Sequence, residues 1–179
     1  MNRNIKIVTG NALHSHFSKN WEKMIDPEAK KNKMLKWNEA DLKKAISDSN
    51  SVLALVGEEA VGFVCLILRQ KYVEICALIV TPEHRKRGIG MALMEKAISL
   101  AKEEHSDKSI ILFSNEISSR MCEKFGFVIA DKKSLNIETW KACDVCPEHK
   151  NFPDCRCQPM MLVPTINIKQ RHPAKPEGN

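Results

Sequence analysis

The chain has 179 residues, 43% of them hydrophobic, and a formal net charge of +6. Such a chain fits one soluble globular domain with a substantial core, and its positive charge suits an anionic ligand. No apolar run approaches the roughly 20 residues that span a bilayer, and no signal-peptide core follows the first residues, so we expect a cytoplasmic protein without a membrane partner. Aromatic residues make up 6% of the chain, which argues against a base-stacking surface and against nucleic acid as a partner.

The first third of the chain predicts one strand and two helices. An alternating segment at residues 5–8 is typical of a strand. Apolar residues then recur at helical spacing between residues 11 and 47. We expect two helices there, because Asp26-Pro27 interrupts the run and Asn38 or Asp41 can cap a second helix.

Strands and helices alternate along the rest of the sequence. Short runs rich in Val, Ile, Leu and Phe predict strands at residues 52–56, 61–68, 72–80, 109–113, 127–130 and 160–163. Longer runs with helical periodicity predict helices at residues 89–104 and 116–125. This order predicts an α/β (α+β) fold in which helices flank a mixed central sheet.

The most informative segment is Val80–Met91, in which a strand is followed by a basic loop and by two glycines at the start of a helix. A helix N-terminus has unpaired N–H groups and a partial positive charge, so it can hold a phosphate. Gly88 and Gly90 let the backbone approach an anion, and the basic run Arg85–Arg87 adds charge. P-loop and Rossmann fingerprints do not fit the residues that follow Gly90. A solvated basic turn is the alternative interpretation.

These residues carry a resemblance to a known family. Arg85-Lys86-Arg87-Gly88-Ile89-Gly90 resembles the Arg/Gln-x-x-Gly-x-Gly/Ala signature of the GNAT superfamily of acyl-CoA-dependent N-acetyltransferases. Asn115 and the block Glu123–Phe127 resemble a second signature of that family, and the order of elements matches too. The resemblance is specific over residues 74–127. It implies a mostly antiparallel sheet and direct transfer of an acetyl group from acetyl-CoA to an amine acceptor in a ternary complex.

The resemblance also implies which residues bind acetyl-CoA. Backbone groups at a strand end would bond the pantetheine arm, and the loop with the helix start would hold the pyrophosphate. The residues implied are Leu78, Ile79 and Val80 for the pantetheine, Arg85, Lys86, Arg87, Gly88, Ile89, Gly90 and Met91 for the pyrophosphate, and Asn115 for a further contact on the pantetheine side. The acceptor stays open among protein amines, polyamines and small metabolites.

Glu74 is the candidate catalytic base, because its distance from Gly88 resembles that of the catalytic glutamate in histone-type members. Strand alternation would place Glu74 on one face with Cys76, Leu78 and Val80. A carboxylate in such an apolar strand should have a raised pKa, which suits a base near neutral pH. An exposed glutamate, or one paired with a lysine, is the alternative.

Cys122 is the candidate proton donor, and it departs from the family pattern, in which a tyrosine usually precedes this block. A thiol with an ordinary pKa could protonate the departing CoA thiolate. Alternatively, Cys122 is a small buried hydrophobic residue and water supplies the proton. The departure also leaves open a CoA-binding sensor or regulator that lacks turnover, and the basic charge leaves open a nucleic-acid-binding module.

Four of the seven cysteines crowd one short segment: Cys143, Cys146, Cys155 and Cys157. An odd total argues against a disulfide framework. The Cys-x-x-Cys half is typical of a zinc knuckle, so the cluster is a candidate structural zinc site, in which His149 can replace one thiolate. Free or redox-active thiols and a disulfide stay open. In acyltransferases of this kind, this position often shapes the acceptor pocket.

These observations together predict the organisation of the chain. We expect a single N-acetyltransferase domain at residues 1–166, interrupted by a Cys-rich insert at residues 141–158. The polar, Pro-containing residues 167–179 are expected to form a disordered tail. A homodimer is compatible with the sequence.

Overall fold

The computed structural model describes residues 5–31, 34–132, 135, 146, 151 and 154–163. Within them, one seven-stranded sheet has the order β1-β2-β3-β4-β5-β7-β6. Its strands are β1 Ile5–Thr9, β2 Ser51–Val56, β3 Glu59–Leu68, β4 Tyr72–Val80, β5 Ser109–Ser114, β6 Phe127–Ile129 and β7 Gln158–Leu162. Every neighbouring pair is antiparallel except β4 and β5, which are parallel. The expected α/β fold with a mostly antiparallel sheet is therefore confirmed.

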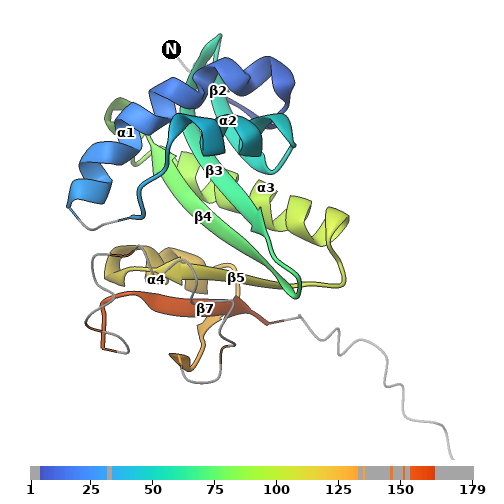
Figure 1. Ribbon diagram of the computed structural model, residues 1–179, viewed down its shortest axis with the longest axis vertical. Coiled ribbons are helices and arrows are strands. Elements are labelled where there is room, and N and C mark those ends of the chain that lie inside the picture. Colours follow the sequence, from blue (N-terminus) through green and yellow to red (C-terminus); the bar gives the residue numbers. More distant parts are fainter. Residues whose placement is uncertain are drawn as a thin grey trace, which may run out of the picture.

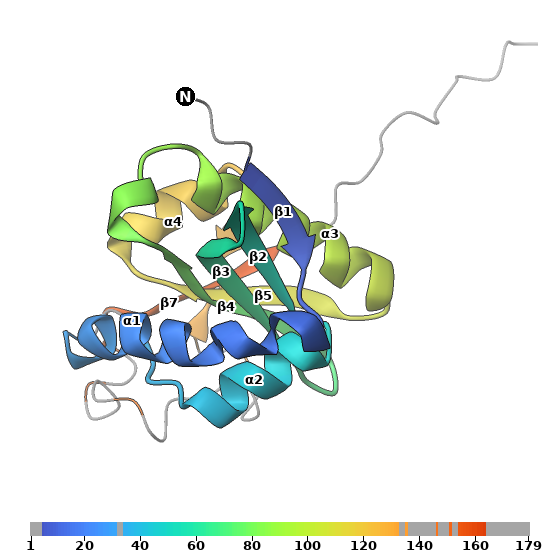
Figure 2. The ribbon, with the colours of Figure 1, turned by 90° about the horizontal axis from the view of Figure 1, so that it is seen from above.

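Helices cover both faces of this sheet. The α-helices are α1 Ser18–Lys30, α2 Glu39–Ser47, α3 Ile89–Glu104 and α4 Glu116–Glu123, and short 3-10 turns span Ala12–Phe17 and Pro82–His84. Figures 1 and 2 show α1 and α2 on one face and α3 and α4 on the other. Among the helices that the structure describes, none combines the length and apolar character needed to cross a membrane.

Two apolar cores hold the layers together. On one face, α3 packs so closely on β3 that a Cβ added to Gly62 would lie 2.8 Å from a methyl carbon of Leu93. On the other face, the rings of Trp21 in α1 and Phe63 in β3 are stacked with centroids 5.5 Å apart. Helix α2 starts as expected at Asn38, whose side chain accepts a hydrogen bond from the backbone N–H of Asp41 at 2.8 Å.

The expected helix break at Asp26-Pro27 is wrong, because α1 continues through Pro27 to Lys30. A proline inside a helix removes the hydrogen bond to the carbonyl four residues earlier, here that of Lys23. Both Lys23 and Pro27 are exposed, so water can hydrate that carbonyl. The helix also has only one further turn to complete, which keeps the cost of the interruption small.

A bulge in β4 decides which of its residues share a face. Ala77 has a positive φ of 54°, and the pairing with β3 shifts register opposite this residue. Before the bulge, Val73 and Ile75 pack in the core beneath α3; after it, Leu78 and Val80 do. The expectation that Glu74 shares a face with Leu78 and Val80 is therefore wrong. Glu74 alternates with Val73 and Ile75, so it lies on the α1–α2 side of the sheet.

Beyond the bulge, β4 separates from β5. The parallel pairing runs only from Tyr72 opposite Ser109 to Ile75 opposite Leu112, within the residues described. The last two residues of β5, Phe113 and Ser114, pair instead with β7. Figure 1 shows the two strands diverging after this point. The sheet thus opens at its centre.

Candidate functional site

A cavity of about 460 Å³ occupies the opening between β4 and β5. Its walls include Met94 and Leu112, which belong to the core beneath α3, and Trp37 and Cys76, which pack against the α1–α2 core. Residues of both faces therefore line one continuous space.

The strand end predicted to bind pantetheine lies in this cavity. Leu78, Ile79, Val80 and Arg85 all line it. Residues 76–80 of β4 pair with β3 alone among the described strands, so their other edge faces the cavity. The Arg85 Nε donates a hydrogen bond to the carbonyl oxygen of Val80 at 3.0 Å, which holds the basic loop at the end of the strand.

Asn115 also lines the cavity, and it has a structural role that the sequence did not suggest. Its side-chain oxygen accepts a hydrogen bond from the backbone N–H of Ser118 at 3.0 Å, and the Ser118 hydroxyl accepts one from the backbone N–H of Asn115 at 3.0 Å. This reciprocal pair caps the start of α4. Ser114 and Ser118 line the cavity too, although no motif pointed to them.

The glycine loop forms an open cradle at the start of α3. Gly88 is the N-cap, with a left-handed φ of 79°, and the first bond of the helix runs from the N–H of Ala92 to the carbonyl of Gly88 at 3.1 Å. The N–H groups of the three residues between them thus have no acceptor within the helix. A Cβ added at Gly88 or Gly90 would meet no atom within 4 Å.

The remaining loop residues supply charge or anchoring. Lys86 also adopts a positive φ, of 59°, which helps to turn the chain toward the helix. The side chains of Arg85, Lys86, Arg87 and Met91 are exposed, and that of Ile89 is buried in the core. Free donors, open space and three cations together could accommodate a pyrophosphate group, and that this loop binds one stays a prediction.

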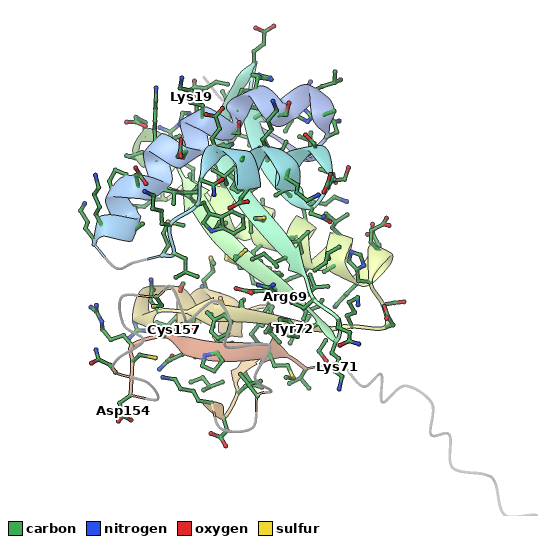
Figure 3. All side chains as sticks on the ribbon, viewed as in Figure 1. Lys19, Arg69, Lys71, Tyr72, Asp154 and Cys157 are labelled. Atoms are coloured by element: carbon green, nitrogen blue, oxygen red, sulfur yellow. The ribbon has the colours of Figure 1, made fainter. Side chains whose placement is uncertain are left out.

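Glu74 lies in the cavity wall and is only 4% exposed. Burial raises the pKa of its carboxyl group to about 7, although the positive charge of Arg69 lowers it in part. Arg69 lies near Tyr72 at the hairpin that joins β3 to β4 (Figure 3). The expected rise in pKa is confirmed, and the alternative of an exposed glutamate is wrong. A carboxyl group with this pKa exchanges protons readily at neutral pH.

Cys122 lies on α4, lines the cavity and is 2% exposed. Burial raises the pKa of its thiol to about 11, and the negative charge of Glu123 acts in the same direction. The expectation of an ordinary thiol pKa is therefore wrong. Proton transfer from such a thiol to the thiolate of CoA is uphill, because the thiolate has the lower pKa.

Three of the clustered cysteines, Cys146, Cys155 and Cys157, line the same cavity, and none of the three forms a disulfide. Figure 3 shows Cys157 beside β7. Cys143 and His149 lie outside the described residues. Among the residues described, no group of three His, Cys, Asp or Glu side chains is placed to hold a metal ion, so the zinc hypothesis gains no support there.

Several cavity residues carry no sequence signal. Met34, Leu35 and Trp37 follow α1 in a connection without a motif. Arg156 lies between Cys155 and Cys157, whose spacing predicted a zinc site and no role for the arginine. Only the folded chain brings these distant residues to one space.

The comparisons with known proteins agree with this fold. An acetyltransferase from Streptococcus agalactiae superposes with a TM-score of 0.60 and 18% identity, over 92% of this chain and 100% of that one. Rv2747 from Mycobacterium tuberculosis, in complex with CoA, gives a TM-score of 0.69 and 17% identity, over 89% and 99%. N-acetylglutamate synthase from Neisseria gonorrhoeae, with CoA and N-acetyl-glutamate, gives a TM-score of 0.70 and 18% identity, over 92% and 36%.

The sequence comparisons are more specific. An uncharacterized N-acetyltransferase of Chlorobaculum tepidum is 29% identical over 96 residues, which are 54% of this chain and 57% of that protein. The chain thus matches little more than half the length of this curated relative. The profile of the Acetyltransferase (GNAT) family matches residues 11–127, a range that includes both Glu74 and the glycine loop. With the open sheet and the cradle at α3, this match means that the chain belongs to the Acetyltransferase (GNAT) family.

Proposed function

We propose that this protein transfers an acetyl group from acetyl-CoA directly to an amine in a ternary complex. The observation that carries the proposal is a single cavity that joins the strand end after Ala77 to the buried carboxyl group of Glu74. Family membership supports acetyl-CoA as the donor. We also propose that residues 1–166 form one catalytic domain.

In this proposal, acetyl-CoA occupies the cavity with its thioester toward Glu74. The free edge of β4 at Leu78–Val80 would bond the pantetheine arm, and the cradle at Gly88–Met91 would hold the pyrophosphate. This arrangement fixes the thioester beside the acceptor and removes much of the entropic barrier of a reaction between two molecules.

In the proposed reaction, Glu74 takes a proton from the acceptor ammonium, directly or through water. The neutral nitrogen then attacks the thioester carbonyl carbon, a C–N bond forms, and the C–S bond breaks. The CoA thiolate leaves and takes a proton from water, the amide nitrogen gives its excess proton to the hydroxide ion so formed, and the proton on Glu74 returns to solvent. The thiol of CoA keeps its proton at neutral pH, so exchange with solvent is enough to protonate the thiolate, whereas the raised pKa of Cys122 makes direct transfer from that thiol uphill.

The rate of CoA release should depend on pH through Glu74. A base acts only when it is deprotonated, so kcat/KM is expected to rise with pH, to pass its midpoint near pH 7 and to level off above it. The measurement is CoA release with saturating acetyl-CoA and an amine panel between pH 5.5 and 9. A flat profile across this range would contradict Glu74 as the base.

Replacing Cys122 with alanine should change kcat by less than about fivefold, because water can supply the proton without this thiol. Cys65→Ala is the matched control, since Cys65 is a second fully buried thiol that lies outside the cavity lining. A loss of about 100-fold or more in Cys122→Ala alone would identify the thiol as the proton donor.

A CoA-binding sensor is the second candidate, since Cys122 occupies the place of the usual tyrosine. It is distinguished by acetyl-CoA binding, measured by calorimetry, without CoA release in the presence of any amine in the panel.

A further inference from the structure

In the proposed function the cofactor leaves one part of the cavity lining unused, and we call this part the second end. Its lining comes from two segments far apart in sequence, and the residues that matter here are Glu28, Met34, Leu35, Trp37, Arg156 and Cys157. Glu74 lines the same cavity, as do the strand-end residues Leu78–Val80. If the pantetheine arm occupies the strand end, as in the proposed function on which this inference rests, the second end receives the acceptor.

The second end carries both carboxyl groups and a cation, whereas the loop at the cradle carries three cations. Glu28 and Glu74 are its carboxyl groups, and Arg156 is its cation among the described lining residues. An acceptor amine arrives as an ammonium ion, which the carboxyl groups attract. A guanidinium group has five N–H donors, so Arg156, which is exposed, can contact an anion in addition to the interaction that it already makes. It would repel the additional positive charges of a polyamine.

Apolar side chains form the rest of the wall. Met34, Leu35 and Trp37 are half-buried in the connection between α1 and α2 and face the cavity. Such surfaces favour a hydrocarbon or thioether body over a hydrophilic one. The whole cavity measures about 460 Å³ with its cofactor end included, so the acceptor end suits a small molecule better than a folded protein surface.

We propose that the acceptor is an amine that also carries a carboxylate and a small apolar body, as an apolar α-amino acid does. Arg156 binds the carboxylate as a two-bond pair. Trp37, with Met34 and Leu35, contacts the apolar body, and Glu74 receives the proton of the amino group. Arg156 is then the residue that makes the enzyme prefer amino acids to amines without a carboxylate.

The test compares acceptors that differ only in the carboxylate. We expect kcat/KM for L-phenylalanine and L-leucine to exceed that for phenethylamine and 3-methylbutylamine by at least about tenfold, with spermidine a poorer acceptor still. Arg156→Gln is expected to lower kcat/KM for the amino acids about 10- to 100-fold and to change it less than threefold for the two amines. Arg156→Lys should restore part of the loss.

Two controls separate this effect from general damage. Arg120→Gln removes an exposed arginine of α4 that does not line the cavity, and it should change neither acceptor class. Trp37→Ala should raise KM for leucine and for 3-methylbutylamine alike, because it removes the contact with the apolar body and not with the carboxylate.

A second readout does not depend on turnover. By calorimetry, the CoA-loaded protein should bind N-acetyl-L-phenylalanine with higher affinity than N-phenethylacetamide. Arg156→Gln should abolish this difference in affinity. Equal acceptance of amines and amino acids, preference for spermidine, or equal losses for both classes in Arg156→Gln would overturn the inference and leave the proposed function intact. Acetyl-CoA binding without acetylation of any amine would overturn both.

Discussion

Replacing Glu74 with glutamine lowers kcat by about 100- to 10,000-fold, which is the usual contribution of a general base. Glutamine has nearly the same shape, so it keeps the packing of β4 and removes only the group that accepts a proton. The pH dependence should vanish together with the rate. The measurement is CoA release by the variant at pH 8, with acetyl-CoA binding checked by calorimetry to show that the site is intact.

The same substitution should stabilise the protein in alkaline solution. The carboxyl group has a pKa near 7 when folded and 4.5 as an ordinary glutamate, so the folded state holds its proton more tightly. The free energy of unfolding of the wild type therefore falls as pH rises from 4.5 through 7. The pKa difference of 2.5 between the folded and unfolded states corresponds to about 3 kcal/mol. Glutamine carries no charge to bury, and we expect a net gain of about 1–2 kcal/mol at pH 8.

Urea denaturation at two pH values tests this gain. Glu74→Gln should exceed the wild type in unfolding free energy at pH 8 and match it near pH 4, where Glu74 is mostly protonated in both the folded and the unfolded state. Glu58→Gln alters an exposed glutamate and should shift stability little at either pH. An active Glu74→Gln enzyme, or one equally stable with the wild type at pH 8, would be inconsistent with a buried base.

Replacing Gly90 with glutamate abolishes acetyl-CoA binding and leaves the fold of the free protein unchanged. A side chain at this position meets no atom within 4 Å, so the free protein can accommodate it. A carboxylate in the first turn of a helix also interacts favourably with the helix dipole. In the complex, however, it would occupy the cradle and repel the pyrophosphate.

Thermal unfolding measures the effect directly. With acetyl-CoA at 100 times its Kd, binding should stabilise the wild type by about 2.7 kcal/mol, which corresponds to a rise in Tm of about 5–10 °C. Gly90→Glu, alone or with Arg87→Glu, should show no rise. Lys102→Glu introduces a negative charge on the exposed surface of the same helix, remote from its start, and should keep the full shift. An undiminished shift in Gly90→Glu would place the cofactor elsewhere.

Local features of the site were predictable from the sequence because their geometry depends on neighbouring residues. Glycines at the start of a helix favour an open anion cradle wherever the helix lies, since the donors and the missing Cβ belong to the same few residues. The central strands of the sheet were also predictable from local sequence. Runs of branched apolar residues, as in Val61–Leu68, are suited to pleated, buried backbone.

Other features required the tertiary structure. The bulge at Ala77 arises from the pairing of β4 with β3, and it moves Leu78 to the face opposite Glu74. The pKa of Cys122 depends on how deeply α4 buries it, which a sequence pattern does not specify. Pro27 remains within α1 because the interrupted turn faces solvent.

The acceptor end is the clearest case. Trp37 and Arg156 lie 119 positions apart in the sequence, and neither belongs to a motif that predicts an acceptor site, since the cysteines around Arg156 suggested zinc instead. They meet because β4 and β5 diverge and leave an opening that the α1–α2 connection and the residues before β7 enclose. The amino-acid sequence by itself determined the cradle, the strand that carries Glu74 and the order of the elements, because these depend on local propensity. The tertiary structure decided which distant side chains line one cavity with Glu74, because chain topology and burial set their distance and their environment.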